Sequence, residues 1–240
     1  MYRNILFDLY GTLVDIKTDE STQRFWTAAA AFFSRRGARY TCRELEKSYR
    51  GAVARGLAAN KRTRYPDIKI VSVFSMLYAA KGVAPDGGLL LRTAEFFRAA
   101  STEHIGLYPG VEELLDKLAM NNKNMFIVSN GQREFSWPEL VRLGIAGRFR
   151  ALYSSSETGI CKPDPAFLRY VLEKEGLDAG ECLFVGDNPE TDIAGAAAAG
   201  IDSALIVRGV RGREKRAAKA TYEITGGDIT KVLRCALRKA

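Results

Sequence analysis

The chain has 240 residues, of which 47% are hydrophobic and 27% are charged, a balance typical of globular proteins and too apolar for a disordered chain. The 36 Lys and Arg residues against 28 Asp and Glu residues give a formal net charge of +8. No stretch approaches the ~18 uninterrupted apolar residues that a membrane-spanning helix needs. Asp8 and Asp15 interrupt the first apolar run, which is therefore unlike the uncharged core of a secretory signal. The composition predicts a folded protein with no membrane partner.

The four cysteines are scattered along the chain and form no C-x-x-C pair. Such spacing is typical of reduced proteins rather than of disulfide-linked domains or zinc sites. We therefore expect a cytoplasmic protein in which all four thiols are free: Cys42, Cys161, Cys182 and Cys235.

The net positive charge is concentrated in two segments. Residues 35–64 carry ten basic and two acidic side chains, a net of +8, and residues 208–240 carry ten basic and three acidic ones, a net of +7. The rest of the chain has a net charge of −7. Each basic segment either forms a solvated surface or creates a positive electrostatic potential that attracts anions. Because zinc-finger spacing, RNP-like strands and heptads behind a basic region are missing, we expect a small anionic substrate and no nucleic acid.

The first expected strand is Asn4–Phe7, an apolar run that ends at a carboxylate. The sequence then changes character, because residues 17–102 show the apolar spacing of consecutive helices rather than of strands. This stretch predicts a helical insertion, and the turn at residues 108–110 marks the return of the chain to the strand-forming region. The expected helices of the insertion are Ser21–Arg36, Cys42–Asn60, Lys69–Lys81 and Gly88–Thr102.

Beyond the insertion, short apolar runs alternate with helical patterns, which predicts a parallel α/β sheet. The expected strands are Met125–Val128, Ala151–Tyr153, Cys182–Val185 and Ser203–Val207. The expected helices are Val111–Met120, Ser136–Leu143, Pro165–Glu175 and Asp192–Gly200, the last with Gly200 ending it. We therefore expect a Rossmann-like core built from residues 1–16 and 103–240, with a helical cap formed by residues 17–102. Residues 208–220 are either a surface element or a helix.

Polar side chains follow several of the expected strands, and ligands bind beyond the carboxyl ends of parallel strands. Asp8 follows the first strand, Ser129 the second and Asp187 the fourth, while Lys162 lies in the loop before the helix that starts at Pro165. A carboxylate can act as a nucleophile when it is held in line with its target. Two nearby carboxylates repel each other unless one is protonated or a cation lies between them, and Asp8 with Asp187 suits the oxygen preference of Mg²⁺.

These segments together resemble the motifs of the haloacid dehalogenase superfamily. The resemblance is carried by FDLYGTL at residues 7–13, VSN at 128–130, CKPDP at 161–165 and GDNPETD at 186–192, and the helical insertion is similar to that superfamily's cap. It implies a hydrolase in which Asp8 attacks the substrate and water then releases the covalent intermediate. The implied catalytic residues are Asp8, Thr12, Ser129, Lys162 and Asp192; the implied substrate-binding residues are Tyr10, Gly11, Asn130, Gly131 and Asn188; and the implied Mg²⁺ ligands are Asp8, the backbone carbonyl of Tyr10 and Asp187.

Tyr10 departs from the phosphatases of this superfamily, which carry a second Asp two residues after the nucleophile. That acid protonates the leaving oxygen and activates water, and a tyrosine with a pKa near 10 is a poor substitute at neutral pH. The Tyr10 pattern instead resembles the 2-haloacid dehalogenases, whose halide leaving group needs no proton. The fourth motif, with Asp187 and Asp192, resembles the phosphatases.

The favoured function is Mg²⁺-dependent hydrolysis of a small phosphorylated metabolite by a monomer or homodimer. The first alternative is a metal-independent 2-haloacid dehalogenase, in which a cap arginine such as Arg35, Arg36 or Arg39 would receive the halide. The second alternative is a catalytically silent binding protein that keeps the fold.

Overall fold

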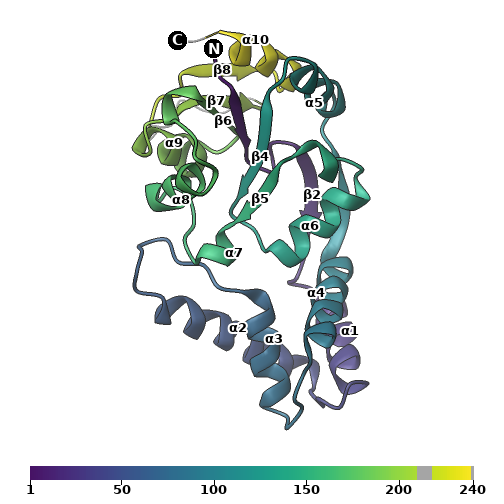
Figure 1. The fold of residues 1–240 in the computed structure, drawn as a ribbon. Coiled ribbons are helices and arrows are strands. Elements are labelled where there is room, and N and C mark those ends of the chain that lie inside the picture. The colour runs from purple at the N-terminus through teal and green to yellow at the C-terminus, as the bar shows by residue number, and fades with distance from the viewer. Residues whose placement is uncertain (210–217, 239–240) are drawn as a thin grey trace.

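A six-stranded parallel sheet forms the centre of the computed structural model, which describes residues 1–209 and 218–238 (Figure 1). The strands lie in the order β5-β4-β1-β6-β7-β8, and every neighbouring pair is parallel. The predicted α/β class is confirmed. The six strands are β1 (Asn4–Phe7), β4 (Asn124–Ser129), β5 (Ala151–Ser154), β6 (Cys182–Gly186), β7 (Asp202–Val207) and β8 (Tyr222–Thr225).

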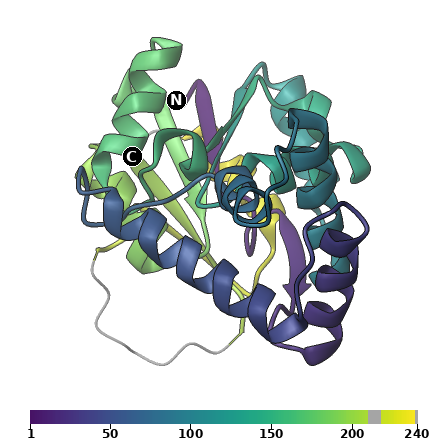
Figure 2. The same ribbon diagram turned by 90° about the horizontal axis from the view of Figure 1, so that it is seen from below.

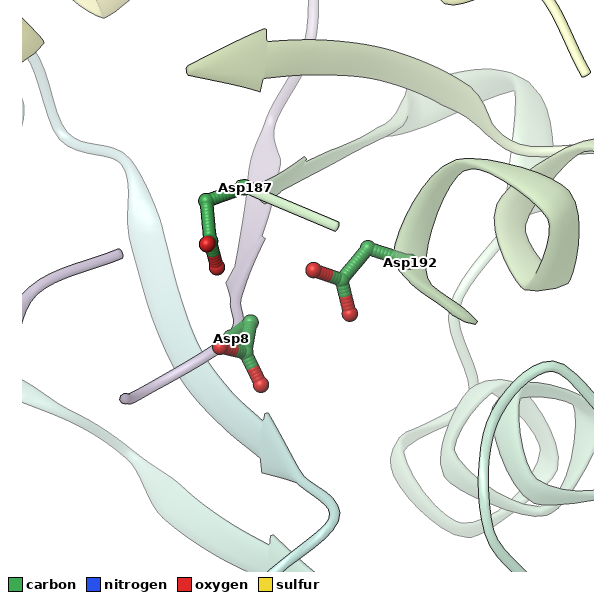
Figure 3. Close-up of side chains that lie close together, drawn as sticks. All are labelled: Asp8, Asp187 and Asp192. Atoms are coloured by element: carbon green, nitrogen blue, oxygen red, sulfur yellow. The ribbon is translucent and has the colours of Figure 1, made fainter. Parts of the chain in front are cut away.

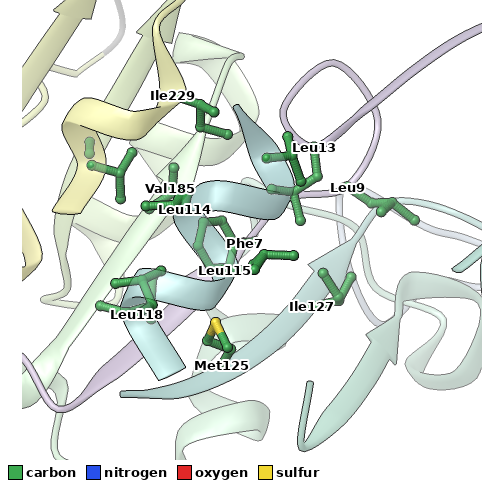
Figure 4. Packing of buried hydrophobic residues seen from close by; sticks show 14 of the residues in the cluster. Phe7, Leu9, Leu13, Leu114, Leu115, Leu118, Met125, Ile127, Val185 and Ile229 are labelled. Carbon is green, nitrogen blue, oxygen red and sulfur yellow. The ribbon is translucent and has the colours of Figure 1, made fainter. Parts of the chain in front are cut away.

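Helices cover both faces of the sheet, which explains why its strands are nearly continuous apolar runs. Successive side chains of a strand point to opposite faces. Ile5 and Phe7 therefore pack into the hydrophobic cluster under α5 (Val111–Met120) and α10 (Val232–Leu237), part of which Figure 4 shows. Leu6 packs into a second cluster on the other face. The helices of that second face are α8 (Pro165–Glu175) and α9 (Ala194–Ala198).

Four helices form a separate layer, drawn below the sheet in Figure 1 and nearest the viewer in Figure 2. They share a hydrophobic cluster of their own, rich in aromatic rings, that is distinct from the clusters on the sheet. Side chains of Thr22, Thr41 and Asp86 cap three of the four, satisfying amides that a helix start leaves unbonded. The helices are α1 (Gln23–Ser34), α2 (Cys42–Ala59), α3 (Ile70–Ala79) and α4 (Gly87–Ser101).

A two-stranded antiparallel ribbon joins this helical layer to the sheet. It consists of β2 (Val14–Thr18) and β3 (Thr102–Leu107), and neither strand was expected from the sequence. Both are only partly buried, so they lack the strong apolar pattern that identifies a core strand. The two predicted boundaries of the cap, at residues 16–17 and 102–103, fall inside these strands. The division into a core and a cap at these residues stays a prediction.

Several other elements differ from the sequence prediction. The helix expected at Ser136–Leu143 begins earlier, as α6 (Arg133–Arg142), so its proline lies inside the helix. The helix expected at Asp192–Gly200 is instead a π-helical turn, Pro189–Ile193, followed by α9. Gly200 has a φ of 74°, the left-handed conformation expected of a residue that ends a helix.

The shortest elements were not predicted, because a few residues carry little periodicity. They include the edge strand β8 and the helix α10. The others are α7 (Ser155–Thr158) and the 3₁₀ turns Ala146–Arg148, Ala179–Glu181 and Ile229–Lys231. Most of the segment 208–220, expected as a surface element or a helix, lies outside the described residues. Within residues 1–209 and 218–238, no helix has the length and apolarity to cross a bilayer.

The aromatic cluster of the helical layer predicts that Phe97→Ala destabilises this layer strongly. The Phe97 ring is 1% exposed, and its centroid lies 4.8 Å from that of Phe25 and 5.0 Å from that of Phe74. We expect the free energy of unfolding to fall by roughly 3–5 kcal/mol, measured by urea denaturation followed by tryptophan fluorescence. Leu91→Ala, on the same helix but 52% exposed, is the control. Equal losses for both variants would contradict the prediction.

Candidate active site

The carboxyl ends of three neighbouring strands converge on one point of the sheet. Asp8 follows β1, which lies between β4 and β6; Ser129 ends β4, and Asp187 follows β6. After β1 the chain builds β4 and β5 on one side of it and then crosses back to build β6, β7 and β8 on the other side. Such a reversal of strand order is the place where α/β sheets open a crevice for ligands. The structure therefore brings together side chains that are up to 179 residues apart in the sequence.

Three carboxylates meet at this edge, as Figure 3 shows. Asp8, Asp187 and Asp192 each offer one oxygen, and these oxygens all lie within 4.8 Å of one another. Asp8 is 8% exposed and Asp192 only 1% exposed, so water screens their charges weakly. Such a cluster needs compensating positive charge.

Lys162 supplies a buried positive charge to two of the three carboxylates. Its Nζ donates to Asp8 Oδ1 at 2.7 Å and to Val128 O at 2.8 Å, and it lies 2.8 Å from Asp192 Oδ1. An ammonium group has three protons, and these three contacts use all of them. We conclude that Lys162 holds Asp8 and Asp192 in place, while its charge also faces the position of any anion bound at Asp8.

Asp192 is oriented by the π-helical turn in which it lies. Its Oδ2 accepts a hydrogen bond from the backbone amide of Asn188 at 3.0 Å, opposite the Lys162 contact of Oδ1. The carboxylate also lies directly against Gly186, where a Cβ would come within 2.4 Å of Oδ2. Both oxygens of Asp192 are thus engaged by the protein.

Thr12 and Gly11 bring the loop after β1 against Asp187. The Thr12 hydroxyl lies 3.2 Å from Asp187 Oδ1 and 3.4 Å from Asp8 Oδ2, so it can donate to either carboxylate. Gly11 has a φ of 86°, and a Cβ at this position would lie 2.7 Å from both oxygens of Asp187. Only glycine allows this close approach.

The buried position of Asp8 changes its acidity. Burial raises the pKa of Asp8 to about 7; Lys162 opposes this shift, while the charges of Asp192 and Asp187 add to it. A second cation would favour the ionised form of Asp8. Hard divalent cations such as Mg²⁺ prefer carboxylate oxygens, so the donor set of Asp8 and Asp187 fits this kind of ion.

The end of β4 and the two residues after it contribute one hydroxyl and two loop contacts. Ser129 is 1% exposed, and among the described residues its hydroxyl has no hydrogen-bond partner, which leaves it available to a ligand. Asn130, expected to bind substrate, uses its amide on the backbone of Lys162, with contacts of 2.8 and 2.9 Å. A Cβ on Gly131 would lie 3.2 Å from the Tyr10 ring, so this glycine makes room for that side chain.

Asn188, the other amide expected to bind substrate, caps the turn that it precedes. Its Oδ1 accepts from the backbone amides of Glu190 at 2.9 Å and Thr191 at 3.2 Å. Sequence alone does not separate such a cap from a ligand contact, because Asn is common in both roles.

Tyr10 points away from the carboxylates and toward α6. Its hydroxyl donates to Glu139 Oε2 at 2.5 Å and lies 3.0 Å from the Ser136 hydroxyl. Burial, followed by the charge of Glu139, raises the pKa of Tyr10 well above its ordinary value. The hydroxyl therefore stays protonated and is already committed to Glu139, so it does not replace the missing acid.

Arg98 and Glu139 complete a buried ion pair that sequence reasoning missed. Arg98 Nε, at the end of α4, donates to Glu139 Oε1 at 2.6 Å, and the guanidinium lies 5.2 Å from the centre of the Tyr10 ring. Of the three arginines considered from the sequence, Arg36 instead packs on Phe32 within the helical layer, at 3.4 Å. No local pattern marks Arg98, because its partner is 41 residues away.

The family comparison agrees with this geometry. The haloacid dehalogenase-like hydrolase family matches residues 2–200, well over half of the chain, and the protein belongs to this family. The resemblance drawn from the four motifs is confirmed.

Individual relatives include both phosphatases and dehalogenases. The chain is 32% identical to a phosphoserine phosphatase from Thermus thermophilus over 67% of its own length and 62% of the relative's, so less than two thirds of that relative is matched. The putative HAD-hydrolase YfnB from Bacillus subtilis has a solved structure that is described as bound to magnesium. Its sequence is 25% identical to this chain over 98% of both chains, and the two structures superpose with a TM-score of 0.58. A 2-haloacid dehalogenase from Pseudomonas syringae pv. tomato is 22% identical over the whole of both chains, with a TM-score of 0.68, which shows the shared fold alone.

The arrangement around Lys162 predicts that Lys162→Met destabilises the protein. The change would leave two buried carboxylates without their shared cation, and we expect the free energy of unfolding at pH 7.5 to fall by roughly 3–5 kcal/mol in urea denaturation. Lys117→Met is the matched control, because Lys117 forms an exposed pair with Glu113 that is worth less than about 1 kcal/mol. Similar losses of unfolding free energy for the two variants would show that the buried ion pairs of Lys162 contribute no more to stability than an exposed pair.

Proposed function

We propose that this hydrolase cleaves small phosphate monoesters in a reaction that depends on Mg²⁺. The observation that carries the proposal is the cluster of Asp8, Asp187 and Asp192, whose oxygens lie within 4.8 Å of one another. The 2-haloacid dehalogenases resemble each other in a serine- and asparagine-rich fourth motif, whereas this chain has three acids there, Asp187, Glu190 and Asp192. The similarity to a phosphoserine phosphatase supports the same class of substrate.

In the proposed reaction, Asp8 is the nucleophile. Its carboxylate attacks the phosphorus atom, the ester oxygen leaves, and a phosphoryl group is bound to Asp8; water then hydrolyses this acyl phosphate and restores the carboxylate. The contact of Oδ1 with Lys162 at 2.7 Å fixes the Asp8 side chain. Fixing the attacking atom in this way removes much of the entropic cost of the reaction.

Several groups are placed to stabilise the negative charge of the phosphoryl oxygens. Lys162 supplies a buried charge and Ser129 a free hydroxyl, while Thr12 keeps the loop after β1 in register with Asp187. Asp8, Asp187 and the backbone carbonyl of Tyr10 are the proposed ligands of the ion. Bound Mg²⁺ would offset the charge of the carboxylates and of the phosphoryl oxygens.

The leaving group receives little help from the protein. Position 10 normally carries the acid in phosphatases of this family, and here the Tyr10 hydroxyl is committed to Glu139. We therefore expect turnover to favour esters whose alcohols leave without a proton.

A second candidate function is hydrolytic dehalogenation of a 2-haloacid, which the tyrosine at position 10 favours. In that reaction Asp8 would displace halide from carbon, and no acid would be needed. A silent binding protein with this fold is the remaining alternative. We also propose a cytoplasmic monomer or homodimer without a nucleic-acid partner.

A single substrate panel separates these functions. Phosphate monoesters and 2-haloacids are each incubated with the protein in Mg²⁺ and in EDTA, and phosphate and halide release are measured. We expect phosphate release that requires Mg²⁺ and is abolished in Asp8→Asn. Halide release that persists in EDTA would favour the dehalogenase, and no release from any substrate would favour the binding protein.

The missing acid predicts that Tyr10→Asp increases phosphatase activity. A carboxyl at this position can protonate the leaving oxygen, so we expect kcat on an alkyl phosphate to rise on the order of 10²-fold, with a smaller gain on p-nitrophenyl phosphate. Tyr10→Phe is the control, because it removes the hydroxyl contacts to Glu139 and Ser136 without adding an acid. An equal change in both variants, or no gain in Tyr10→Asp, would count against the missing-acid argument.

A further inference from the structure

Arg208 follows β7 and reaches the loop that carries the nucleophile motif. Its Nη2 donates to the backbone carbonyl of Thr12 at 2.8 Å, and its Nη1 donates to that of Gly11. The guanidinium is stacked on the Tyr108 ring, 3.6 Å from its centre. A planar guanidinium can bond two neighbouring carbonyls and stack on a ring at the same time, which a lysine cannot do.

The surroundings of Arg208 fit this side chain closely. A Cβ on Gly227 would lie 3.0 Å from Arg208 Cγ, and Gly227 has a φ of 71°, so this turn leaves room for the arginine stem. The carboxylates of Asp187 and Asp15 are near enough to attract its charge. Arg208 therefore contacts three separate parts of the chain, which are the loop at Gly11 and Thr12, Tyr108 and the turn at Gly227.

The same contacts lie at the base of the ribbon that leads to the helical layer. The Gly11 amide donates to Val14 O at 2.9 Å, where β2 begins, and the Tyr108 amide donates to Leu13 O at 3.0 Å, just after β3 ends. The Tyr108 hydroxyl also lies 3.4 Å from Asp15 Oδ1 in β2. By holding Gly11, Thr12 and Tyr108 in place, Arg208 therefore also holds the start of β2 and the end of β3.

We propose that Arg208 is a positioning residue, which holds the loop after Asp8 in its reactive arrangement and anchors the base of the β2–β3 ribbon. Thr12 transmits the effect, because its carbonyl accepts from Arg208 while its hydroxyl lies within hydrogen-bond distance of both Asp187 and Asp8. The consequence for turnover rests on the proposed phosphatase function, whereas the consequence for the loop does not.

Amide hydrogen exchange tests the loop directly and needs no substrate. Wild type, Arg208→Gln, Arg208→Lys and the control Arg169→Gln are compared; Arg169 is an exposed arginine on α8 that also donates to a carbonyl, that of Ala198. We expect Arg208→Gln to increase exchange in peptides covering residues 9–18 and 104–110 at least tenfold, with residues 165–175 unchanged. Arg208→Lys keeps the charge but not the paired geometry, so it should restore only part of the protection.

Steady-state kinetics on the best phosphate ester of the panel tests the positioning role. We expect kcat to fall roughly 10- to 100-fold in Arg208→Gln while KM stays within about twofold, since misplaced reacting groups slow the chemical step more than they weaken binding. Arg169→Gln should match the wild type in both parameters.

The possible outcomes separate this proposal from the function on which it partly depends. If the wild type hydrolyses no ester, the proposed function fails and the exchange result alone decides the role of Arg208. Unchanged exchange in Arg208→Gln would overturn the proposal, and so would full protection in Arg208→Lys, because charge without geometry would then suffice. If Arg208→Gln does not fold, the same criteria are applied to Arg208→Lys.

Discussion

The site depends on one buried ammonium group. Lys162 comes from the loop before α8, yet it lies 2.7 Å from Asp8 after β1 and 2.8 Å from Asp192 near the end of β6. Removing these charges from water costs several kcal/mol per ion, and the cost is offset only where geometry and hydrogen bonds are nearly ideal. Asn130 provides part of that geometry, because its amide holds the Lys162 backbone at both its amide and its carbonyl. Three strand ends and one loop are thereby held at a single point.

The fold places these groups through the sheet order rather than through proximity in sequence. With β1 between β4 and β6, the nucleophile motif has a neighbouring strand end on each side. Helices cover both faces of the sheet, and ligands of α/β sheets bind beyond the carboxyl ends of the strands, where these groups lie. The ribbon of β2 and β3 starts directly beside this edge, which means that the helical layer and the nucleophile loop share one attachment.

The sequence predicted the buried strands and the residues that follow them, because strands covered on both faces are apolar runs that need no partner to be recognised. It did not predict the ribbon, whose strands are half-exposed, or the pairs of Arg98 with Glu139 and of Arg208 with the Gly11 and Thr12 carbonyls. Each of these contacts joins residues 41 to 197 positions apart, and neither partner carries a local signal. The Asn130 amide and the Asn188 Oδ1 bond to the protein's own backbone, and the binding of substrate by these two residues stays a prediction.

The tyrosine at position 10 is part of a packing arrangement and not an isolated change of chemistry. Its ring needs the space that Gly131 leaves without a Cβ, and its hydroxyl needs Glu139, which in turn needs the charge of Arg98. Arg98 belongs to α4 and Glu139 to α6, so the residue that replaces the usual acid also connects the helical layer to the sheet domain. Because a buried carboxylate is stable only with its partners, these residues depend on one another. The tyrosine at position 10 therefore has two consequences: the site lacks the usual acid, and the helical layer gains a contact with the sheet domain through Glu139.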